Sequence, residues 1–213
     1  MDDAPPPRSV GVLGVGRVGT VFAALAERAG LEVRTASSTD DPAEACASDV
    51  VILAVPMSRY RTLPVEALRG RLVVDAMNHW WELDGARPDL DDPATSTSET
   101  VQAFLAGSRV VKALNHASVW ELENLGRPAG APDRRGIAIA GDDAADVAAV
   151  AALVDALGFD PVVAGPLAAG VAFEPPTEIF GSDATAAQIR SMLDRFPRSQ
   201  RGRVVARARQ GRG

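Results

Sequence analysis

Gly14-Val15-Gly16-Arg17-Val18-Gly19 follows the apolar run at residues 10–13 and opens a stretch, residues 18–29, with the apolar pattern of a helix. The six residues match G-x-G-x-x-G. In this pattern the first glycine permits a tight turn, the second lets the backbone approach a pyrophosphate, and the third lets helix and strand pack closely. The pattern alone is weak, but it gains weight at a first strand–helix junction, where a helix N-terminus attracts phosphate. The alternative is a glycine-rich turn that binds nothing. We predict a dinucleotide site that includes Gly14, Val15, Gly16, Arg17 and Val18.

Apolar runs and helix-like stretches alternate along the rest of the chain. Strands are predicted at residues 10–13, 31–36, 49–55, 72–75, 109–113, 137–140 and 161–163. Helices are predicted at residues 18–29, 60–69, 99–106 and 144–157, with a further helix within 182–195. The run at 49–55 is continuous and β-branched, as in a strand that is covered on both faces of a parallel sheet. The pattern predicts an α/β fold with a doubly wound, mostly parallel Rossmann-type sheet and a small C-terminal α/β extension.

The length of 213 residues allows one domain with a small addition. We expect a flexible tail at 1–8, a dinucleotide-binding unit at 9–115, a smaller C-terminal α/β part at 116–196 that completes the crevice, and a basic tail at 197–213. That tail carries six arginines in seventeen residues, which is typical of a solvated or disordered segment. Since no recognition fold accompanies this charge, it is not interpreted as a nucleic-acid site.

Composition excludes several classes of protein. An apolar fraction of 46% and a net charge of −6 are those of a soluble globular protein, with no reason to expect a nucleic-acid partner. The single cysteine, Cys46, excludes an intrachain disulfide and a thiolate metal cluster. The longest apolar run, residues 50–57, is too short to cross a bilayer, and the N-terminus lacks the zones of a signal peptide. We therefore expect a cytoplasmic protein without a membrane partner.

The end of the second predicted strand bears on the choice of cofactor. Residues 35–38 read Thr-Ala-Ser-Ser, whereas NAD-specific sites usually carry an acid there that binds the ribose hydroxyls. Ser37 and Ser38 can donate hydrogen bonds to a 2′-phosphate, and Arg17, Arg34 or Arg59 can supply charge. The alternative is that the serines only cap the following turn. We predict NADP(H) over NAD(H).

Other residues follow predicted strands at the edge where a doubly wound sheet binds ligands. Val55, Pro56 and Met57 close the third strand, where Pro56 is either a wall against the nicotinamide ribose or an ordinary strand-ending proline. Asn78 follows the fourth strand and either binds the nicotinamide part or caps a turn. Ala113 and Asn115 follow the fifth strand and are predicted to form the crevice floor.

No protein acid, base or metal ligand is predicted at the site. His79 and His116 are the only histidines and belong to no metal-spacing motif, and no hydrolase signature is present. Lys112 is interpreted as a strand-edge charge or an interface residue. Trp80, Trp81 and Trp120 are more typical of a lid or a homodimer interface than of a stacking site, and we expect a homodimer.

The chain resembles the NADP-dependent oxidoreductases of the deazaflavin coenzyme, and it is also similar to the cytosolic oxidoreductase domain of the six-transmembrane metalloreductases. The resemblance runs from about Ser9 to about Gly181. Its carriers are Val12-Leu13-Gly14-Val15-Gly16-Arg17-Val18-Gly19, Val51-Ile52-Leu53-Ala54-Val55-Pro56, Val73-Val74-Asp75-Ala76-Met77-Asn78, Ser98-Glu99-Thr100, Val110-Val111-Lys112-Ala113-Leu114-Asn115 and Ala164-Gly165-Pro166-Leu167. The resemblance implies hydride transfer between NADP(H) and a small-molecule redox acceptor, either a deazaflavin or a flavin.

The chain departs from that pattern in two places. Ser38 stands where the family commonly has an arginine that grips the 2′-phosphate, and the membrane domain of the metalloreductases is absent. Hydroxyacid dehydrogenases and pyrroline carboxylate reductases begin with a similar unit but continue into a long helical domain, whereas this chain returns to strand–helix–strand after Asn115. The alternative from another class is a non-catalytic NADP(H)-binding redox sensor or interaction protein.

Overall fold

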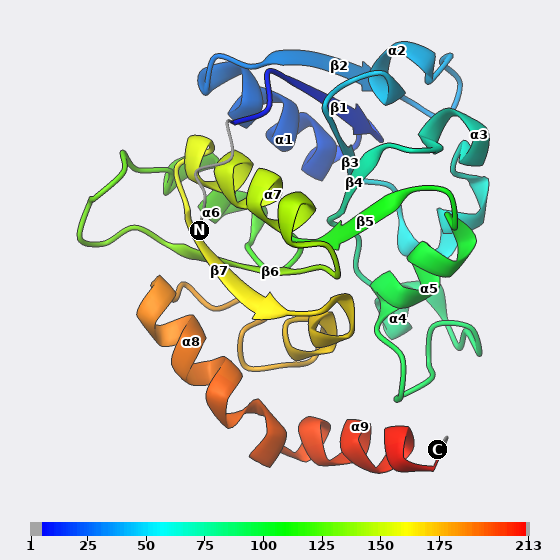
Figure 1. Cartoon of the computed structure of the whole chain (residues 1–213), viewed down its shortest axis with the longest axis vertical. Helices are drawn as coiled ribbons and strands as arrows, with labels where there is room; N and C mark the ends of the chain where they lie inside the picture. Colours follow the sequence, from blue (N-terminus) through cyan, green and yellow to red (C-terminus); the bar gives the residue numbers. More distant parts are fainter. Residues whose placement is uncertain (1–5, 212–213) are drawn as a thin grey trace.

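Residues 6–211, which a computed structural model describes, form a seven-stranded sheet with helices on both faces (Figure 1). The strands are β1 (Ser9–Leu13), β2 (Glu32–Ala36), β3 (Val50–Leu53), β4 (Leu72–Asp75), β5 (Arg109–Lys112), β6 (Gly136–Ala140) and β7 (Asp160–Gly165). Their order is β2-β1-β3-β4-β5-β6-β7. Neighbouring strands are parallel except β5 and β6, which meet antiparallel at Lys112 and Ala140. The predicted doubly wound, mostly parallel α/β fold is therefore confirmed.

Strict alternation along each central strand sends side chains to two separate cores. Val50 and Ile52 of β3 pack into one core with α1 (Arg17–Arg28), α6 (Val119–Asn124) and α7 (Ala144–Ala156). Val51 and Leu53 face the opposite core, which contains residues of α2 (Ala43–Cys46), α3 (Val65–Leu68) and α5 (Thr97–Phe104). Each of these four β3 side chains is at most 1% exposed, and full burial of such a side chain stabilises the fold by about 1.5–3 kcal/mol.

One predicted helix is divided in the structure. Residues 60–69 were expected to be a single helix, but a 3₁₀ helix, η1 (Met57–Thr62), ends before Leu63, and α3 begins only at Val65. Pro64 explains the break, because proline disfavours helical backbone at the preceding residue and carries no N–H. The short helix α4 (Trp81–Asp84) follows β4. None of the helices within residues 6–211 is both long and apolar enough to span a membrane.

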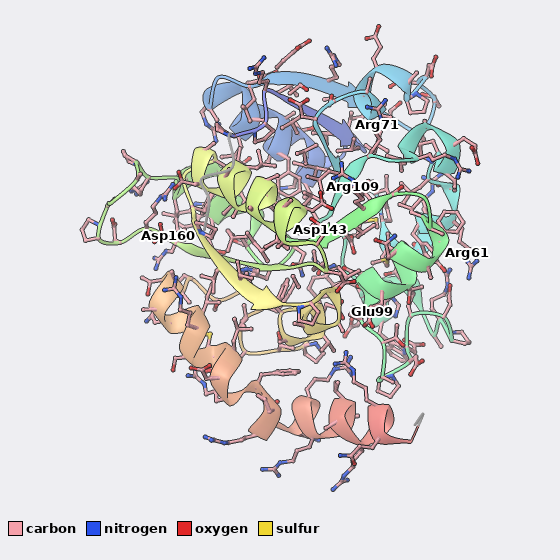
Figure 2. The ribbon with its side chains drawn as sticks, viewed as in Figure 1. Arg61, Arg71, Glu99, Arg109, Asp143 and Asp160 are labelled. Carbon is pink, nitrogen blue, oxygen red and sulfur yellow. The ribbon has the colours of Figure 1, made fainter. Side chains whose placement is uncertain are left out.

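The end of the chain differs from the expected loose tail. After η2 (Leu167–Ala172) and α8 (Ala186–Arg195), a 3₁₀ turn η3 (Phe196–Arg198) leads into α9 (Gln200–Gln210). Ser199 caps α9 by accepting a hydrogen bond from Gly202 N at 2.9 Å. Arg209 donates to the carbonyls of Ala94 and Ala168, each at 2.9 Å. Basic side chains therefore hold α9 against the body, although other α9 side chains project away from the sheet (Figure 2).

The N-terminal tail lies mainly outside the described residues, which begin at Pro6. Its last residue, Arg8, is attached to the sheet, since its backbone N–H donates to Asp49 Oδ2 at 2.8 Å. The sheet runs without interruption across the expected boundary at residue 115, because β5 pairs with β6. The division of residues 9–196 into two parts remains a prediction.

Candidate functional site

Five strands end at one edge of the sheet, and the strand register aligns their last residues. Leu13 pairs with Ala36 and Leu53, Leu53 pairs with Asp75, and Asp75 pairs with Lys112. The segments that follow these residues contain every predicted site residue. The order β2-β1-β3 also makes the junction of β1 and β3 the point where the connections reverse direction, which is where doubly wound sheets bind ligands.

The glycine turn between β1 and α1 has the local geometry that each glycine predicts. Gly14 has φ +106°, and a Cβ there would lie 2.6 Å from Ala54 O. A Cβ on Gly19 would lie 1.8 Å from Gly14 O, so only glycine allows α1 to approach β1 this closely. At Gly16, by contrast, no atom of the described chain lies within 4 Å of a Cβ position. Gly16 therefore faces open space at the start of α1.

The start of α1 has no side-chain cap among the described residues. Gly16 is the N-cap residue and provides no side-chain hydrogen bond, and the first turn of α1 contains no acidic residue. Val15 and Val18 are 46% and 37% exposed, which is unusual for valine next to a buried strand. The N–H groups at the start of α1 therefore have no side-chain cap, and two exposed valines lie in the same turn, an arrangement in which a phosphate can bind.

The loop after β2 contains an acidic residue, Asp40, which bears on the predicted preference for NADP(H). Ser37 N donates to Asp40 Oδ2 at 2.8 Å, and Ser37 Oγ lies 3.0 Å from Thr39 Oγ1. Hydrogen bonds from Ser37 hold the pKa of Asp40 below its usual value, so this carboxylate is negatively charged at neutral pH. Ser38 is exposed. Asp40 therefore places negative charge next to residues 35–38, which carry no acid themselves.

The candidate arginines also differ in availability. Arg34 forms an ion pair with Glu32 at 2.6 Å, so its charge is already neutralised. Arg17 and Arg59 are exposed, and neither has an ion-pair partner within residues 6–211. Arg17 stands in the first turn of α1, and Arg59 belongs to η1 after β3.

The segment after β3 presents Val55 and Pro56 but not the Met57 side chain. Val55 is half-buried and Pro56 is exposed. Met57 is 1% exposed and packs in the core with α2, α3 and α5. What Met57 can offer a ligand at this edge is its backbone.

Asn78 and Asn115 are brought together from the ends of β4 and β5. Asn78 Nδ2 donates to Asn115 O at 2.7 Å, and Asn115 Nδ2 donates to Asn78 Oδ1 at 3.0 Å. Asn115 Nδ2 also donates to Phe173 O at 3.0 Å. Asn115 Oδ1 is buried and has no hydrogen-bond partner among the described residues. The pair joins three segments and leaves one unsatisfied acceptor beneath the crevice.

The backbone at Leu114 adopts a conformation that the sequence does not indicate. Leu114 has φ +65°, a left-handed value that costs a residue other than glycine about 1–2 kcal/mol. Ala113 before it is fully buried, and Ala113 N donates to Asp75 O at 3.4 Å. Strain of this kind is typical of functional sites, where the surrounding packing maintains it. The turn at Leu114 directs Asn115 toward Asn78 and Phe173.

Beneath this edge lies a buried charged cluster, and it corrects the expectation for Lys112. Lys112 is fully buried rather than a strand-edge or interface charge. Its Nζ donates to Met77 O at 2.6 Å and to Asp75 Oδ2 at 3.3 Å. Asp75 is also fully buried and accepts from Ser98 Oγ at 2.5 Å and from Met77 N at 3.0 Å. Lys112 therefore holds the ends of β4 and β5 together just before Asn78 and Asn115.

Glu174 completes the cluster from a distant part of the chain. Its Oε1 accepts from Thr97 N at 2.9 Å and from Thr97 Oγ1 at 2.8 Å. Burial raises the pKa of Glu174, and this rise is opposed by the positive charge of Lys112 and by the two bonds from Thr97. The carboxyl group thus connects the start of α5 to the segment after η2. Nothing in the local sequence around Glu174 indicates this role.

Both histidines bond to other protein groups, although Nδ1 of buried His116 has no hydrogen-bond partner among residues 6–211. His79 Nδ1 lies 3.2 Å from Asp84 Oδ2, and His79 Nε2 lies 3.0 Å from Asp91 Oδ1. His116 is buried and its Nε2 accepts from Ala138 N at 2.9 Å, so the imidazole is neutral with its proton on Nδ1. Burial lowers the pKa of His116 to about 4. His79 therefore connects the end of α4 to the loop at Asp91, and His116 connects the segment after β5 to β6.

A pocket of about 360 Å³ is lined in part by His79, which directly follows Asn78, and by Glu174, which directly follows Phe173. We call it the tryptophan pocket. The residues that line it include His79, Trp80, Trp81, Thr97, Glu174, Pro176 and Arg201. Trp80 contacts Phe180 edge-to-face at 5.2 Å between ring centroids. Trp81 is 64% exposed. Trp120, which belongs to α6 and not to this pocket, is 61% exposed. The expected homodimer interface at these tryptophans remains a prediction.

The fold is similar to that of solved oxidoreductases and related chains. A hypothetical protein from Sinorhizobium meliloti matches with 24% identity and a TM-score of 0.63, over 84% of this chain and 93% of its own. A candidate F420-dependent NADP reductase from Arthrobacter sp. FB24 matches with 23% identity and a TM-score of 0.61, over 90% of this chain and 92% of its own. The 3-hydroxyisobutyrate dehydrogenase of Mycobacterium tuberculosis matches with 18% identity and a TM-score of 0.55, over 76% of this chain but 56% of its own.

Comparison with protein-family models and with curated protein sequences finds no match. At identities under 25%, the structural likenesses establish the doubly wound α/β fold alone.

Proposed function

We propose that the chain is an NADP(H)-dependent oxidoreductase that transfers hydride between nicotinamide and the ring of a deazaflavin or flavin-like acceptor. The observation that carries the dinucleotide part is the open space at Gly16 beside the uncapped start of α1. A pyrophosphate fits such a place because it needs both close backbone approach and N–H donors. Gly14, Val15, Gly16, Arg17 and Val18 would hold the phosphates.

The remaining predicted residues have complementary roles along the same edge. Ser37 and Ser38 would contact the ribose that carries the 2′-phosphate, while Val55, Pro56 and the Met57 backbone would border the rest of the dinucleotide. Asn78 would border the nicotinamide, and Ala113 and Asn115, which are buried, would support this floor from beneath. The tryptophan pocket, whose lining includes His79 directly after Asn78, would receive the acceptor.

Hydride transfer supplies two electrons and one proton to the acceptor ring, and a further proton from solvent completes the reduction. A flavin-like ring spreads the charge itself, so the protein has to bind and orient the two rings and exclude water. His79 and Lys112 are bonded to other protein groups, and buried His116 is neutral, which favours a reaction that needs no protein acid. A carbonyl reductase, in contrast, has to protonate an alkoxide with a positioned acid.

The similarity to a candidate F420-dependent NADP reductase, of which this chain spans 92%, supports the deazaflavin acceptor in this proposal. A non-catalytic NADP(H)-binding protein is the alternative. The tryptophan pocket, lined in part by His79 directly after Asn78, argues for a second ligand and therefore against a binding-only role.

The activity is tested by NADPH oxidation with a panel of deazaflavin, FMN, FAD and quinones as acceptors. We expect turnover with at least one planar isoalloxazine or deazaflavin. NADPH binding without turnover on any acceptor would support the non-catalytic alternative.

The coenzyme preference is tested at Asp40 and Ser38. We expect Ser38→Arg to tighten NADPH binding by about 1–2 kcal/mol, the scale of a charge-assisted hydrogen bond. Asp40→Asn removes negative charge from the same loop and should also favour NADPH, although less. Fluorescence titration of wild type with NADPH and NADH gives the reference, and a wild-type preference for NADH contradicts the proposal.

A further inference from the structure

A second and larger pocket lies where the chain bends between α8 and α9. It has a volume of about 830 Å³ and is formed by residues 176–179, the end of α8, η3 and the start of α9. We call it the elbow pocket. Its walls are apolar at Ile179, Met192, Phe196 and Val204, and basic at Arg195, Arg198 and Arg201. In Figure 1 it corresponds to the junction of α8 and α9, at the lower edge of the molecule.

Two of the three arginines at this pocket have no counter-charge. Arg195 is neutralised, since its Nε donates to Glu178 Oε2 at 2.7 Å and its NH2 group pairs with the other oxygen of Glu178. Arg198 and Arg201 have no ion-pair partner within residues 6–211. Glu178 is the one acid among the residues that line the pocket, so the elbow pocket carries net positive charge.

Two polar atoms at the same pocket are buried without partners. Arg201 Nε and Thr177 Oγ1 are both inaccessible to solvent and form no hydrogen bond with any described residue. A buried donor left unpaired costs about 1–3 kcal/mol, and such an atom is normally explained by a ligand or water that the protein binds. Both atoms can donate a hydrogen bond to an anion.

The backbone at the start of α9 adds to the positive charge of the elbow pocket. α9 begins at Gln200, which lines the pocket together with its N-cap residue Ser199. The first turn of α9 contains no acidic residue, so the positive end of this eleven-residue helix is not compensated there. Free arginines, unpaired donors and a helix N-terminus therefore meet beside apolar walls.

The elbow pocket also adjoins the tryptophan pocket. Pro176 and Arg201 line both. We propose, on the basis of the proposed function, that the hydride acceptor carries an anionic group, and that its ring enters the tryptophan pocket while the anionic group binds in the elbow pocket to Arg201, Arg198 and Thr177. The acceptor is then a phosphorylated or carboxylated planar compound rather than a neutral one.

The experiment measures binding and does not depend on turnover. Equilibrium dialysis compares riboflavin with FMN, and 5-deazariboflavin with its 5′-phosphate, each with and without NADPH. The members of a pair differ only in the phosphate group. Because a charge-assisted contact is involved, we expect the phosphorylated member of at least one pair to bind at least about tenfold more tightly to the wild-type chain.

Three variants locate the source of that selectivity. Arg201→Gln should reduce the ratio to within about threefold, and Thr177→Val, which preserves side-chain shape, should weaken the phosphorylated member alone. Arg203→Gln is the matched control, since Arg203 belongs to α9 but does not line the pocket. Inorganic phosphate should compete with the phosphorylated member in wild type. Urea unfolding confirms that each variant is folded.

Equal affinities within both pairs, selectivity that survives Arg201→Gln, or no binding of any of the four compounds overturns the inference. Selectivity that disappears in Arg201→Gln and persists in Arg203→Gln supports it, even if the acceptor panel shows no NADPH turnover. The failure of the proposed activity and the failure of this inference are therefore distinguishable.

Discussion

The two ends of the candidate crevice are built by different physical means. The β1–α1 turn depends on backbone geometry. Gly14 and Gly19 allow close packing of helix and strand, and Gly16 leaves space for a ligand. At the ends of β4 and β5, a buried network of Lys112, Asp75 and Glu174 fixes the chain beneath Asn78 and Asn115. At Gly16 the first end has room for a side chain as long as no ligand is required, whereas the second end depends on charges that stabilise one another. Function and stability should therefore separate at the first end and remain coupled at the second.

The largest expected effect is at Lys112. Lys112→Met removes the positive charge from fully buried Asp75 and from the neighbourhood of Glu174, and we expect it to lower the free energy of unfolding by about 3–5 kcal/mol. Urea denaturation measures the loss. The double variant Lys112→Met/Asp75→Asn should recover part of it, because the unpaired acid is then absent. A loss below about 1 kcal/mol in Lys112→Met would mean that the charged network does not stabilise this end.

The next effect separates binding from stability at the glycine turn. Gly16→Val places a side chain in the space open to a pyrophosphate, and we expect the Kd for NADPH to rise at least about 100-fold, or about 2.7 kcal/mol, with no change in urea midpoint. Gly19→Ala is the contrasting variant, since its Cβ would clash with Gly14 O, and it should destabilise the fold. Normal NADPH binding by Gly16→Val would place the dinucleotide elsewhere.

A third prediction concerns the dependence of stability on pH. Burial lowers the pKa of His116 from its ordinary 6.5 to about 4, so the folded state binds fewer protons than the unfolded state between these values. The contribution of His116 to stability is complete above pH 6.5 and is lost as the pH falls toward 4. Between pH 7 and pH 5 we expect a loss of about 2 kcal/mol from this group. Urea unfolding of wild type and of His116→Gln, which keeps an acceptor for Ala138 N, should show the loss only in wild type.

The smallest expected effect is on the chemical step. His79 is held by Asp84 and Asp91, and the proposed hydride transfer requires no protein acid. His79→Ala should therefore retain hydride transfer within about tenfold, less than about 1.4 kcal/mol in barrier height. Single-turnover measurement at saturating NADPH and acceptor tests this. A thousandfold slower reaction in a variant that binds both compounds would indicate acid–base catalysis on a carbonyl or imine.

Much of the dinucleotide end could be predicted because its determinants are local. A glycine turn directly after an apolar strand requires only neighbouring residues, and strand periodicity indicates which segments end at the same edge. The hydrogen bond from Ser37 N to Asp40 could not be predicted, although the two residues are only three positions apart, because a loop carboxylate can point either to solvent or to the backbone. Helix α9 was not predicted either, since an arginine-rich composition suggests a solvated tail. In the structure the cap at Ser199 and the hydrogen bonds of Arg209 hold this segment as a helix.

The sequence by itself determined the class of fold and the position of the glycine turn, because short-range spacing and alternation carry that information. The tertiary structure decided the rest: the left-handed turn at Leu114, the Asn78–Asn115 pair, and the burial of Lys112 against Asp75. Glu174 bonds to Thr97 across 77 residues of chain, and the partners of a buried charge at such separation depend on which elements pack together. The same holds for the elbow pocket, whose basic and apolar walls meet only where α8 and α9 fold back onto residues 176–179.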